Sequence, residues 1–363
     1  MSTSPEQRPP LANAASNRFL ELDFIRGSLA IFVLFAHYVL LHSIPYTIHG
    51  GFCVNIFFIL SGFVMSHAYG LKIQENKINL GSFALLRLGR LYPLMLFCSI
   101  LVIFTYALVY VSFREEKGYS IIDTIFMNVF LLQGINSHRW GINDAFWSLG
   151  VEFWVGLTLF YGVIRYKAYF INFLIVLALL FYFYGGKDSL FFGIDVRLIG
   201  HLTRNGLLGI GLGIIVYQIY NALKKYRMSI ILTRALKLIL YFLCVIIALF
   251  ILAYKNTNLK IADIYIEIIA SVTILLGALL KNQCRLFCAK WQSWLGDVSY
   301  SVYVYHWIVI WFVWTWVIKE NYGVSETIIG GFLTLTVTLI VSHYSHKYIE
   351  KPAYKWFRKK IGQ

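Results

Sequence analysis

The sequence has few charged side chains. Only 13% of its 363 residues are Asp, Glu, Lys or Arg, about half the share of an ordinary soluble domain, and 59% are hydrophobic. This composition excludes a water-soluble globule. Cysteine is also scarce. The five cysteines are scattered along the chain, mostly inside apolar runs, at Cys53, Cys98, Cys244, Cys284 and Cys288. This distribution argues against a disulfide framework, and the pair four residues apart has no second Cys or His pair to complete a metal site.

Acidic residues are especially few. The chain has 32 Lys and Arg against 17 Asp and Glu, a net charge of +15. In a soluble protein this excess would suggest a nucleic-acid partner. In a membrane protein Lys and Arg accumulate in cytoplasmic loops, so here the excess indicates topology, and no nucleic acid is expected.

Apolar runs of membrane-spanning length recur along most of the chain. They predict an all-α polytopic integral membrane protein with about ten transmembrane helices. The predicted spans are 22–41, 50–70, 91–112, 147–165, 168–184, 201–221, 238–254, 262–280, 297–318 and 325–346. An eleventh run, 120–134, is short and carries Asp123, Asn128 and Gln133, so it predicts a short helix that does not cross.

The basic residues favour this topology. With ten crossings and both termini in the cytoplasm, 22 of the 32 Lys and Arg fall in cytoplasmic segments. The chain is therefore expected to reside in the cytoplasmic membrane. We predict a flexible N-terminal tail at 1–18, one membrane domain at 19–350 and a basic cytoplasmic tail at 351–363.

The first span carries three ionisable residues, Asp23, Arg26 and His37. Such side chains are costly inside a membrane and mark candidate functional sites. Arg26 and His37 are eleven residues apart, which places them on one helix face but roughly 16 Å apart along the axis. This arrangement fits a long ligand with an anionic end near the cytoplasm and a reactive group deep in the protein. Arg26 could instead snorkel to the interface, and His37 could be a satisfied packing residue.

Several segments resemble the acyltransferase-3 family of integral membrane acyltransferases, in family order. Leu22–Gly27 through His37 is similar to its Arg-x10-His signature, and Gly51–Phe63 to its second-span block ending in Ser-Gly-Phe. The other similar segments are Arg87–Pro93, Trp147–Phe153, Ser299–Trp307 and Tyr348–Pro352. Asn55-Ile56 stands where the family usually has an acidic residue, and Phe153 where a second Glu is frequent.

The resemblance implies transfer of an acyl group, commonly acetyl, from cytoplasmic acyl-CoA to a hydroxyl of a surface or secreted carbohydrate, which could be lipid-linked. Acyl-CoA would be a co-substrate, and no permanently bound cofactor is expected. His37 is the natural general base, because neutral imidazole is available near pH 7. It could also carry the acyl group itself. Glu152 would orient or charge-balance a cation, which could be His37, or make a structural pair.

Arg87 and Arg90 lie three residues apart and could bind the phosphates of CoA. They could also be ordinary basic residues at the cytoplasmic end of a span. Ser61 could donate at the reaction centre or pack between helices. Trp147 is a further candidate for lining the site. His306 lies among tyrosines that could form a sugar platform or an interfacial belt, and the belt is the commoner explanation.

Two other functions fit the same residues. A proton-coupled secondary transporter could use His37 and Glu152 as a proton relay. A sensor or scaffold could use its buried charges only to fix helix packing. The sequence does not reveal the acceptor, the acyl group or the oligomeric state.

Overall fold

The protein is a bundle of long helices, described by a computed structural model. The structure describes residues 18–41, 44, 46–109, 121–134, 143–185, 190–191, 194–195, 201–254, 259–315 and 323–362. All but one residue of the predicted tail at 1–18 therefore lie outside the described residues.

The first half of the chain contains α2 (Leu20–Leu41), α3 (Gly50–Gln74), α4 (Leu80–Val109), α5 (Ile121–Val129), the 3₁₀ turn η2 (Asp144–Phe146), α6 (Trp147–Val155), the π turn η3 (Gly156–Phe160), α7 (Tyr161–Tyr166) and α8 (Tyr169–Gly185). The second half contains α9 (His201–Leu223), α10 (Ile230–Ala253), α11 (Leu259–Leu280), the 3₁₀ turn η5 (Arg285–Phe287), α12 (Lys290–Val313), α13 (Val324–Ser345), the π turn η7 (His346–Glu350) and α14 (Lys351–Lys360). Two short antiparallel strands, β1 (Leu190–Phe191) and β2 (Ile194–Asp195), are the exception to the predicted all-helical fold.

Eight helices are long and apolar enough to cross a membrane, among the residues that the structure describes. The chain is thus a polytopic integral membrane protein. The remaining two predicted spans correspond to α8 and α12, so the count of ten stays a prediction. Helix α5 has nine residues and rises roughly 13 Å, too little to cross a hydrocarbon core of about 30 Å.

Several helices extend beyond the spans predicted for them, and α4 and α13 do so the most. Helix α4 begins at Leu80 rather than at residue 91, which brings Arg87 and Arg90 inside the helix. Helix α13 continues through η7 into α14, so most of the segment predicted as a C-terminal tail is helical. Hydropathy locates the apolar part of a helix and not its ends, because charged side chains that find partners do not terminate a helix.

Small residues allow the central helices to approach closely. Gly209 and Gly213 of α9 lie four apart and face α3, where a Cβ on Gly213 would lie 2.2 Å from the carbonyl oxygen of Ile59. Likewise, a Cβ on Gly296 of α12 would meet the backbone of Asp23 in α2. Such contacts are typical of membrane helices, whose association depends on close packing rather than on hydrophobic burial. They fix α3 against α9 and α2 against α12.

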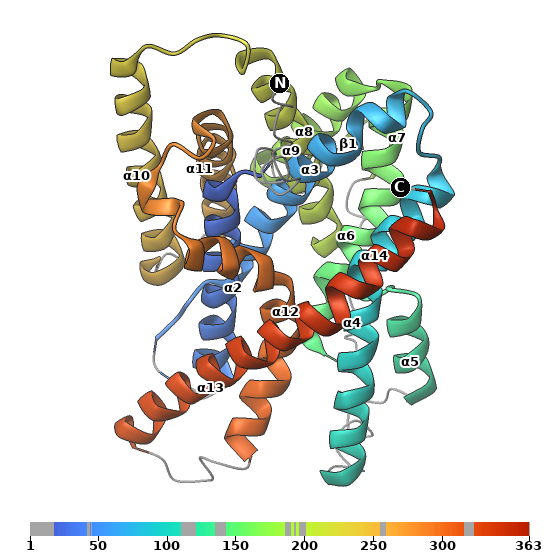
Figure 1. The fold of residues 1–363 in the computed structure, drawn as a ribbon, viewed down its shortest axis with the longest axis vertical. Helices are drawn as coiled ribbons and strands as arrows, with labels where there is room; N and C mark the ends of the chain where they lie inside the picture. The colour runs from blue at the N-terminus through green and yellow to red at the C-terminus, as the bar shows by residue number, and fades with distance from the viewer. Residues whose placement is uncertain are drawn as a thin grey trace, which may run out of the picture.

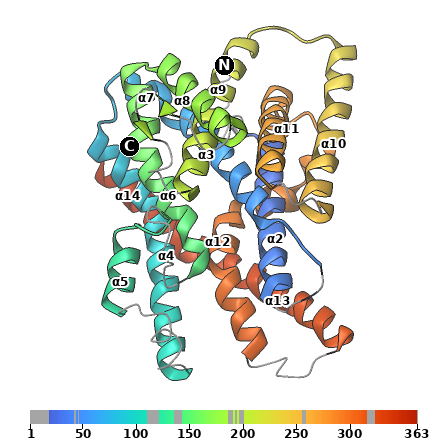
Figure 2. The same ribbon diagram turned by 180° about the vertical axis from the view of Figure 1, so that it is seen from behind.

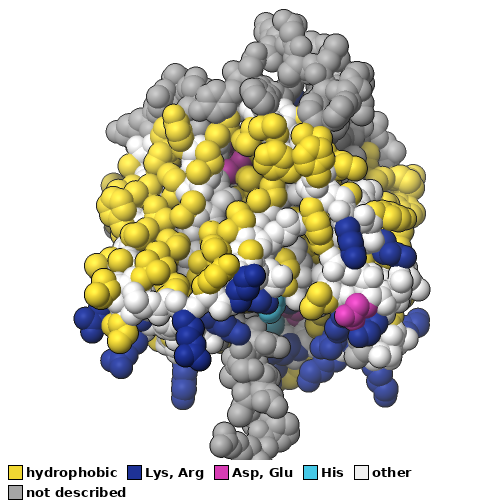
Figure 3. Space-filling model, turned by 90° about the horizontal axis from the view of Figure 1, so that it is seen from above, with side chains coloured by type: hydrophobic (Ala, Val, Ile, Leu, Met, Phe, Trp, Pro, Cys, Tyr) yellow, Lys and Arg dark blue, Asp and Glu magenta, His cyan; other side chains and the backbone are white. Residues whose placement is uncertain are grey.

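The surface separates charge from apolar area. Helix α10 lies at one edge of the bundle and α4, α5 and α14 at the opposite edge, with α2, α3 and α12 between them (Figures 1 and 2). Only 17% of the apolar window of α10 is buried, as expected for a helix that faces lipid. Lys and Arg side chains gather in the lower part of the view in Figure 3, next to a surface that is mainly hydrophobic.

Candidate active site

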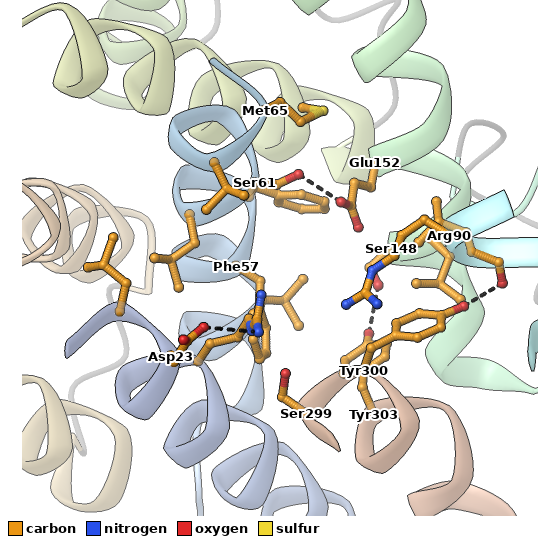
Figure 4. A pocket seen from close by; sticks show the side chains of 18 of the residues that line it. Asp23, Phe57, Ser61, Met65, Arg90, Ser148, Glu152, Ser299, Tyr300 and Tyr303 are labelled. Atoms are coloured by element: carbon orange, nitrogen blue, oxygen red, sulfur yellow. Dashed lines mark hydrogen bonds and ion pairs between the residues drawn. The ribbon is translucent and has the colours of Figure 1, made fainter. Parts of the chain in front are cut away.

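Four arginines line a cavity of about 310 Å³ between α2, α3, α4, α6 and α12. We call it the arginine cavity; besides apolar residues its lining includes Arg18, Asp23, Arg26, Ser61, His67, Arg87, Arg90, Ser148, Glu152, Ser299, Tyr300 and Tyr303. Figure 4 shows Asp23 and Phe57 on one side of the space, with Arg90 and Tyr300 opposite and Ser61 and Glu152 at one end. Two carboxylates, Asp23 and Glu152, lie in the lining with the four arginines, and Asp297 and Glu350 pair with Arg18 and Arg90 from outside it.

Backbone contact between α2 and α12 positions Arg26. Its Nη2 donates to the carbonyl oxygen of Gly296 at 2.7 Å and lies 3.2 Å from Asp23 Oδ1. Asp23 also pairs with Arg18 at 2.7 Å, and Arg18 lies 2.9 Å from Asp297. Burial of Arg18 opposes its charge, but the two carboxylates outweigh that effect and raise the pKa of Arg18. Arg26 therefore faces the cavity from a fixed position instead of snorkelling away.

Glu152 pairs with Arg87 and not with His37. Its Oε1 accepts hydrogen bonds from Arg87 Nη2 and, at 2.7 Å, from Ser61 Oγ. The suggestion that Glu152 balances His37 is therefore wrong, because the two side chains line different cavities. The cation that Glu152 orients is Arg87, whose side chain is only 8% exposed.

Arg90 has a carboxylate partner for which the sequence analysis predicted no role. Its Nη1 pairs with Glu350, which also accepts from Ser301 Oγ at 3.0 Å. Glu350 lies in the π turn η7, and its side chain is 1% exposed. Two features of the sequence could have identified Glu350. It is an ionisable residue close to the end of a predicted span, and it lies within Tyr348–Pro352, a segment that resembles the family.

His37 lines a second cavity, of about 550 Å³. We call it the histidine cavity; it is lined by Ala36, His37, Val39, Leu40, Ile44, Tyr46, Thr47, Ile48, Gly50, Gly51, Val54, Trp147 and Tyr303. No Asp, Glu, Lys or Arg occurs in this lining, as far as the structure describes it. Two residues, Val54 and Tyr303, line both cavities, so the two spaces adjoin there.

His37 is hydrogen-bonded to His306. The distance from His306 Nε2 to His37 Nδ1 is 3.0 Å, and the same Nδ1 lies 3.1 Å from the carbonyl oxygen of Val33. The two imidazole rings stack with centroids 5.0 Å apart, and Trp307 meets His37 edge-on. His306 is fully buried, so it meets His37 inside the protein and is not part of an interfacial belt.

The structure divides the predicted site residues between the two cavities. The arginine cavity contains Asp23, Arg26, Ser61, Arg87, Arg90 and Glu152, and the histidine cavity contains His37 and Trp147, with His306 behind His37. One helix, α2, contributes Arg26 to the first cavity and His37 to the second, so a single passage along both residues stays a prediction.

The sequence of this chain matches the model of a known protein family. The model of the acyltransferase domain, acyltransferase-3, matches residues 19–343. The chain belongs to this family. The acyltransferase-3 resemblance drawn from the six segments is thereby confirmed.

Relatives of this acyltransferase-3 chain include O-acetyltransferases. The chain is 26% identical to O-acetyltransferase OatA of Staphylococcus aureus, over 96% of its own length and 60% of OatA. It is 39% identical to protein 2 in the picA locus of Rhizobium radiobacter, over 23% of this chain and 44% of that protein. An O-acetyl transferase of Shigella phage Sf6 is 29% identical over 36% of this chain and 42% of the phage protein.

The acyltransferase-3 chain spans 60% or less of the length of each of these curated relatives. No solved structure matches it.

Proposed function

We propose that this chain is a membrane O-acyltransferase that moves an acyl group, most simply acetyl, from cytoplasmic acyl-CoA to a hydroxyl of a surface or secreted glycan. The observation that carries the proposal is that an arginine-lined cavity adjoins a cavity containing a hydrogen-bonded histidine. One space suits a polyanion and the other suits proton transfer. An O-acetyltransferase relative that aligns along nearly the whole chain supports the same activity.

The arginine cavity would bind the phosphates of CoA. Arginine presents a planar fork of donors that matches phosphate oxygens, and four arginines line this cavity. Glu152 and Glu350 hold Arg87 and Arg90 in place, so little side-chain entropy is lost when the donor binds.

His37 would act as the general base. We assign the hydrogen of His37 to Nδ1, because the carbonyl oxygen of Val33 can only accept, and this tautomer leaves the lone pair on Nε2. Nε2 takes the proton of the acceptor hydroxyl, whose oxygen attacks the thioester carbonyl carbon. The carbon–sulfur bond then breaks, the CoA thiolate takes the proton from His37, and an O-acyl ester and free CoA result.

His306 would support this cycle without touching the substrate. Once His37 is protonated at Nε2, its Nδ1–H can donate a charge-assisted hydrogen bond to His306 Nε2, 3.0 Å away. This bond stabilises the imidazolium and fixes the plane of the ring. Transfer through an acyl group carried by His37 uses the same geometry, with attack of Nε2 on the thioester as the first step.

The histidine cavity would receive the acceptor. Its lining combines Trp147, Tyr46 and Tyr303 with the backbone around Gly50 and Gly51, and aromatic rings are suitable stacking surfaces for a sugar. Because Ile44, Tyr46, Thr47 and Ile48 lie between the end of α2 and the start of α3, the acceptor would enter on the side of the membrane opposite the start of α2. This placement leaves the donor on the cytoplasmic side.

A His37→Ala comparison tests the proposal. Membranes containing the wild type, given labelled acetyl-CoA, should transfer label to surface glycan, and mass spectrometry of that glycan should identify the modified hydroxyl. His37→Ala should reduce transfer by roughly 10²- to 10⁴-fold, the usual contribution of a general base, at an unchanged protein level. A His37→Ala protein that acylates at the wild-type rate would refute the role of this residue, and proton flux without dependence on acyl-CoA would support a transporter instead.

A further inference from the structure

Two side chains separate the arginine cavity from the histidine cavity. Val54 of α3 and Tyr303 of α12 line both spaces, and they are only 5% and 7% exposed. The four arginines line only the first space and His37 only the second. A donor that is bound through its phosphates at the arginines and reacts at His37 would therefore bring its acyl end to the border that Val54 and Tyr303 line.

Hydrogen bonds hold Tyr303 in this position. Its hydroxyl donates to the carbonyl oxygen of Ala145 at 2.9 Å and lies 2.7 Å from Ser148 Oγ. A parallel link joins the same two elements, because Asn143 Nδ2 donates to the carbonyl oxygen of Val304 at 3.2 Å. Two neighbouring residues of α12 are thus tied to η2 and its N-cap, and the Tyr303 ring stays in place while these bonds persist. Figure 4 shows Tyr303 next to Ser148 at the border of the arginine cavity.

Val54 forms the other side of this border with a stiff side chain. Valine is β-branched and has one strongly preferred rotamer in a helix, so its two methyl groups occupy fixed positions. One turn earlier, Gly50 and Gly51 line the histidine cavity, and one turn later Phe57 and Phe58 line the arginine cavity. Val54 therefore marks the position on α3 where the glycine lining of the histidine cavity ends and the aromatic lining of the arginine cavity begins.

We propose that Val54 and Tyr303 bound the space that the acyl group occupies where the two cavities adjoin, so that they favour a short acyl group such as acetyl over longer ones, and that they restrict the access of water to the thioester. The inference rests on the function proposed above and specifies which donors are used. Both residues act by limiting space, and neither exchanges a proton or a bond with the substrate.

Shortening Val54 tests the selection. Initial rates of purified wild type and Val54→Ala in lipid discs are compared with acetyl-, propionyl- and butyryl-CoA. Removing two methyl groups should raise kcat/KM for butyryl-CoA relative to acetyl-CoA by about tenfold or more, the usual effect of a methylene-sized change in a fitted pocket. Val64→Ala is the matched control, because Val64 is the same residue type on the same helix and lines only the arginine cavity. The ratio should not change in that variant.

The outcomes separate this inference from the proposed function. A wild type that consumes no acyl-CoA would overturn the function itself. An active wild type together with a folded Val54→Ala protein of unchanged acyl preference would overturn only the selection. If the alanine variant does not accumulate, Val54→Ile adds one methylene instead and should lower the rate with propionyl-CoA more than the rate with acetyl-CoA.

Tyr303→Phe tests the exclusion of water. The variant keeps the ring but loses the hydrogen bonds to Ala145 and Ser148, so the space at this border can widen. Without an acceptor, water would attack the thioester carbon and release free CoA and the acid, and CoA release should rise several-fold over the wild type. Unchanged CoA release from a folded Tyr303→Phe protein would contradict this part of the inference.

Discussion

The two cavities differ in charge. The arginine cavity has four guanidinium groups and two carboxylates in its lining, whereas the described lining of the histidine cavity has no charged residue. A charge inside a membrane protein is stable only with a partner, and each arginine of the first cavity is paired with a carboxylate. The difference fits the proposal that an anionic donor binds in one space and proton transfer takes place in the other.

The two cavities also depend differently on distant parts of the chain. The arginine cavity requires ion pairs between helices, such as Arg90 of α4 with Glu350 of η7. The histidine cavity depends instead on the hydrogen bond between His37 of α2 and His306 of α12. Substitutions in the first cavity should therefore affect folding and donor binding together, while those in the second should affect the rate alone.

The largest effect is expected from breaking the pair of Arg90 and Glu350. Arg90→Gln leaves the almost fully buried Glu350 carboxylate without its cation, which should cost about 3–5 kcal/mol of stability. Arg87→Gln should cost less, because the Glu152 side chain is 24% exposed. Thermal unfolding in detergent, with binding of CoA measured by calorimetry, compares the two variants.

The matched control for that experiment is the double variant Arg90→Gln with Glu350→Gln. A neutral pair removes the isolated charge, so stability should recover while CoA binding stays weak. An Arg90→Gln protein that unfolds at the wild-type temperature would show that this ion pair does not support the arginine cavity.

A smaller effect, confined to the histidine cavity, is expected from His306. His306→Phe keeps a ring in the stack but removes the acceptor for His37 Nδ1–H. We expect kcat to fall by about 10- to 100-fold, less than for loss of the base itself, with KM for acetyl-CoA unchanged because the donor binds in the other cavity. His306→Gln, whose amide oxygen can accept, should restore part of the rate. An increase in KM without a change in kcat would contradict the division between the cavities.

The smallest perturbation tests on which side of the membrane each cavity opens. Val64→Cys places a thiol in the arginine cavity, and Gly51→Cys places one in the histidine cavity, where an added Cβ meets no neighbour. A charged, membrane-impermeant maleimide should label the first from the cytoplasmic side and the second from the opposite side. Labelling of both from the same side would contradict the topology on which the proposed function depends.

The native cysteines should give little background in that experiment. Cys53 and Cys98 are fully buried. Burial and the Glu21 carboxylate raise the pKa of Cys284 and of Cys288 to about 11, so these thiols remain protonated and slow to react at pH 7.5. Raising the pH toward 10 should increase their labelling, because the thiolate fraction grows as the pH approaches the pKa. Rapid labelling of the wild type at pH 7.5 would contradict this expectation.

The sequence predicted the helices and the candidate residues better than it predicted which of those residues contact one another. Arg26 and His37 could be placed on one face because both lie on α2 and helical periodicity relates them. The pairs Arg87–Glu152, Arg90–Glu350 and His37–His306 join residues 65, 260 and 269 positions apart, and no periodicity relates such positions. The neighbours depend on which helices pack together, and that is decided by close contacts such as those of Gly213 and Gly296. The sequence therefore left the partner of Glu152 open and gave Glu350 no role.

The last helix, α14, makes the end of the chain sensitive to its exact length. The π turn η7 before it accommodates one residue more than an α-helical turn, but α14 winds regularly, so deleting a single residue at its start would rotate the rest of the helix by about 100°. Phe357 would leave its place against Gly89, and Tyr354 would move away from Tyr69. One missing codon in this segment would thus separate α14 from the rest of the protein, although no side chain in contact with the donor had changed.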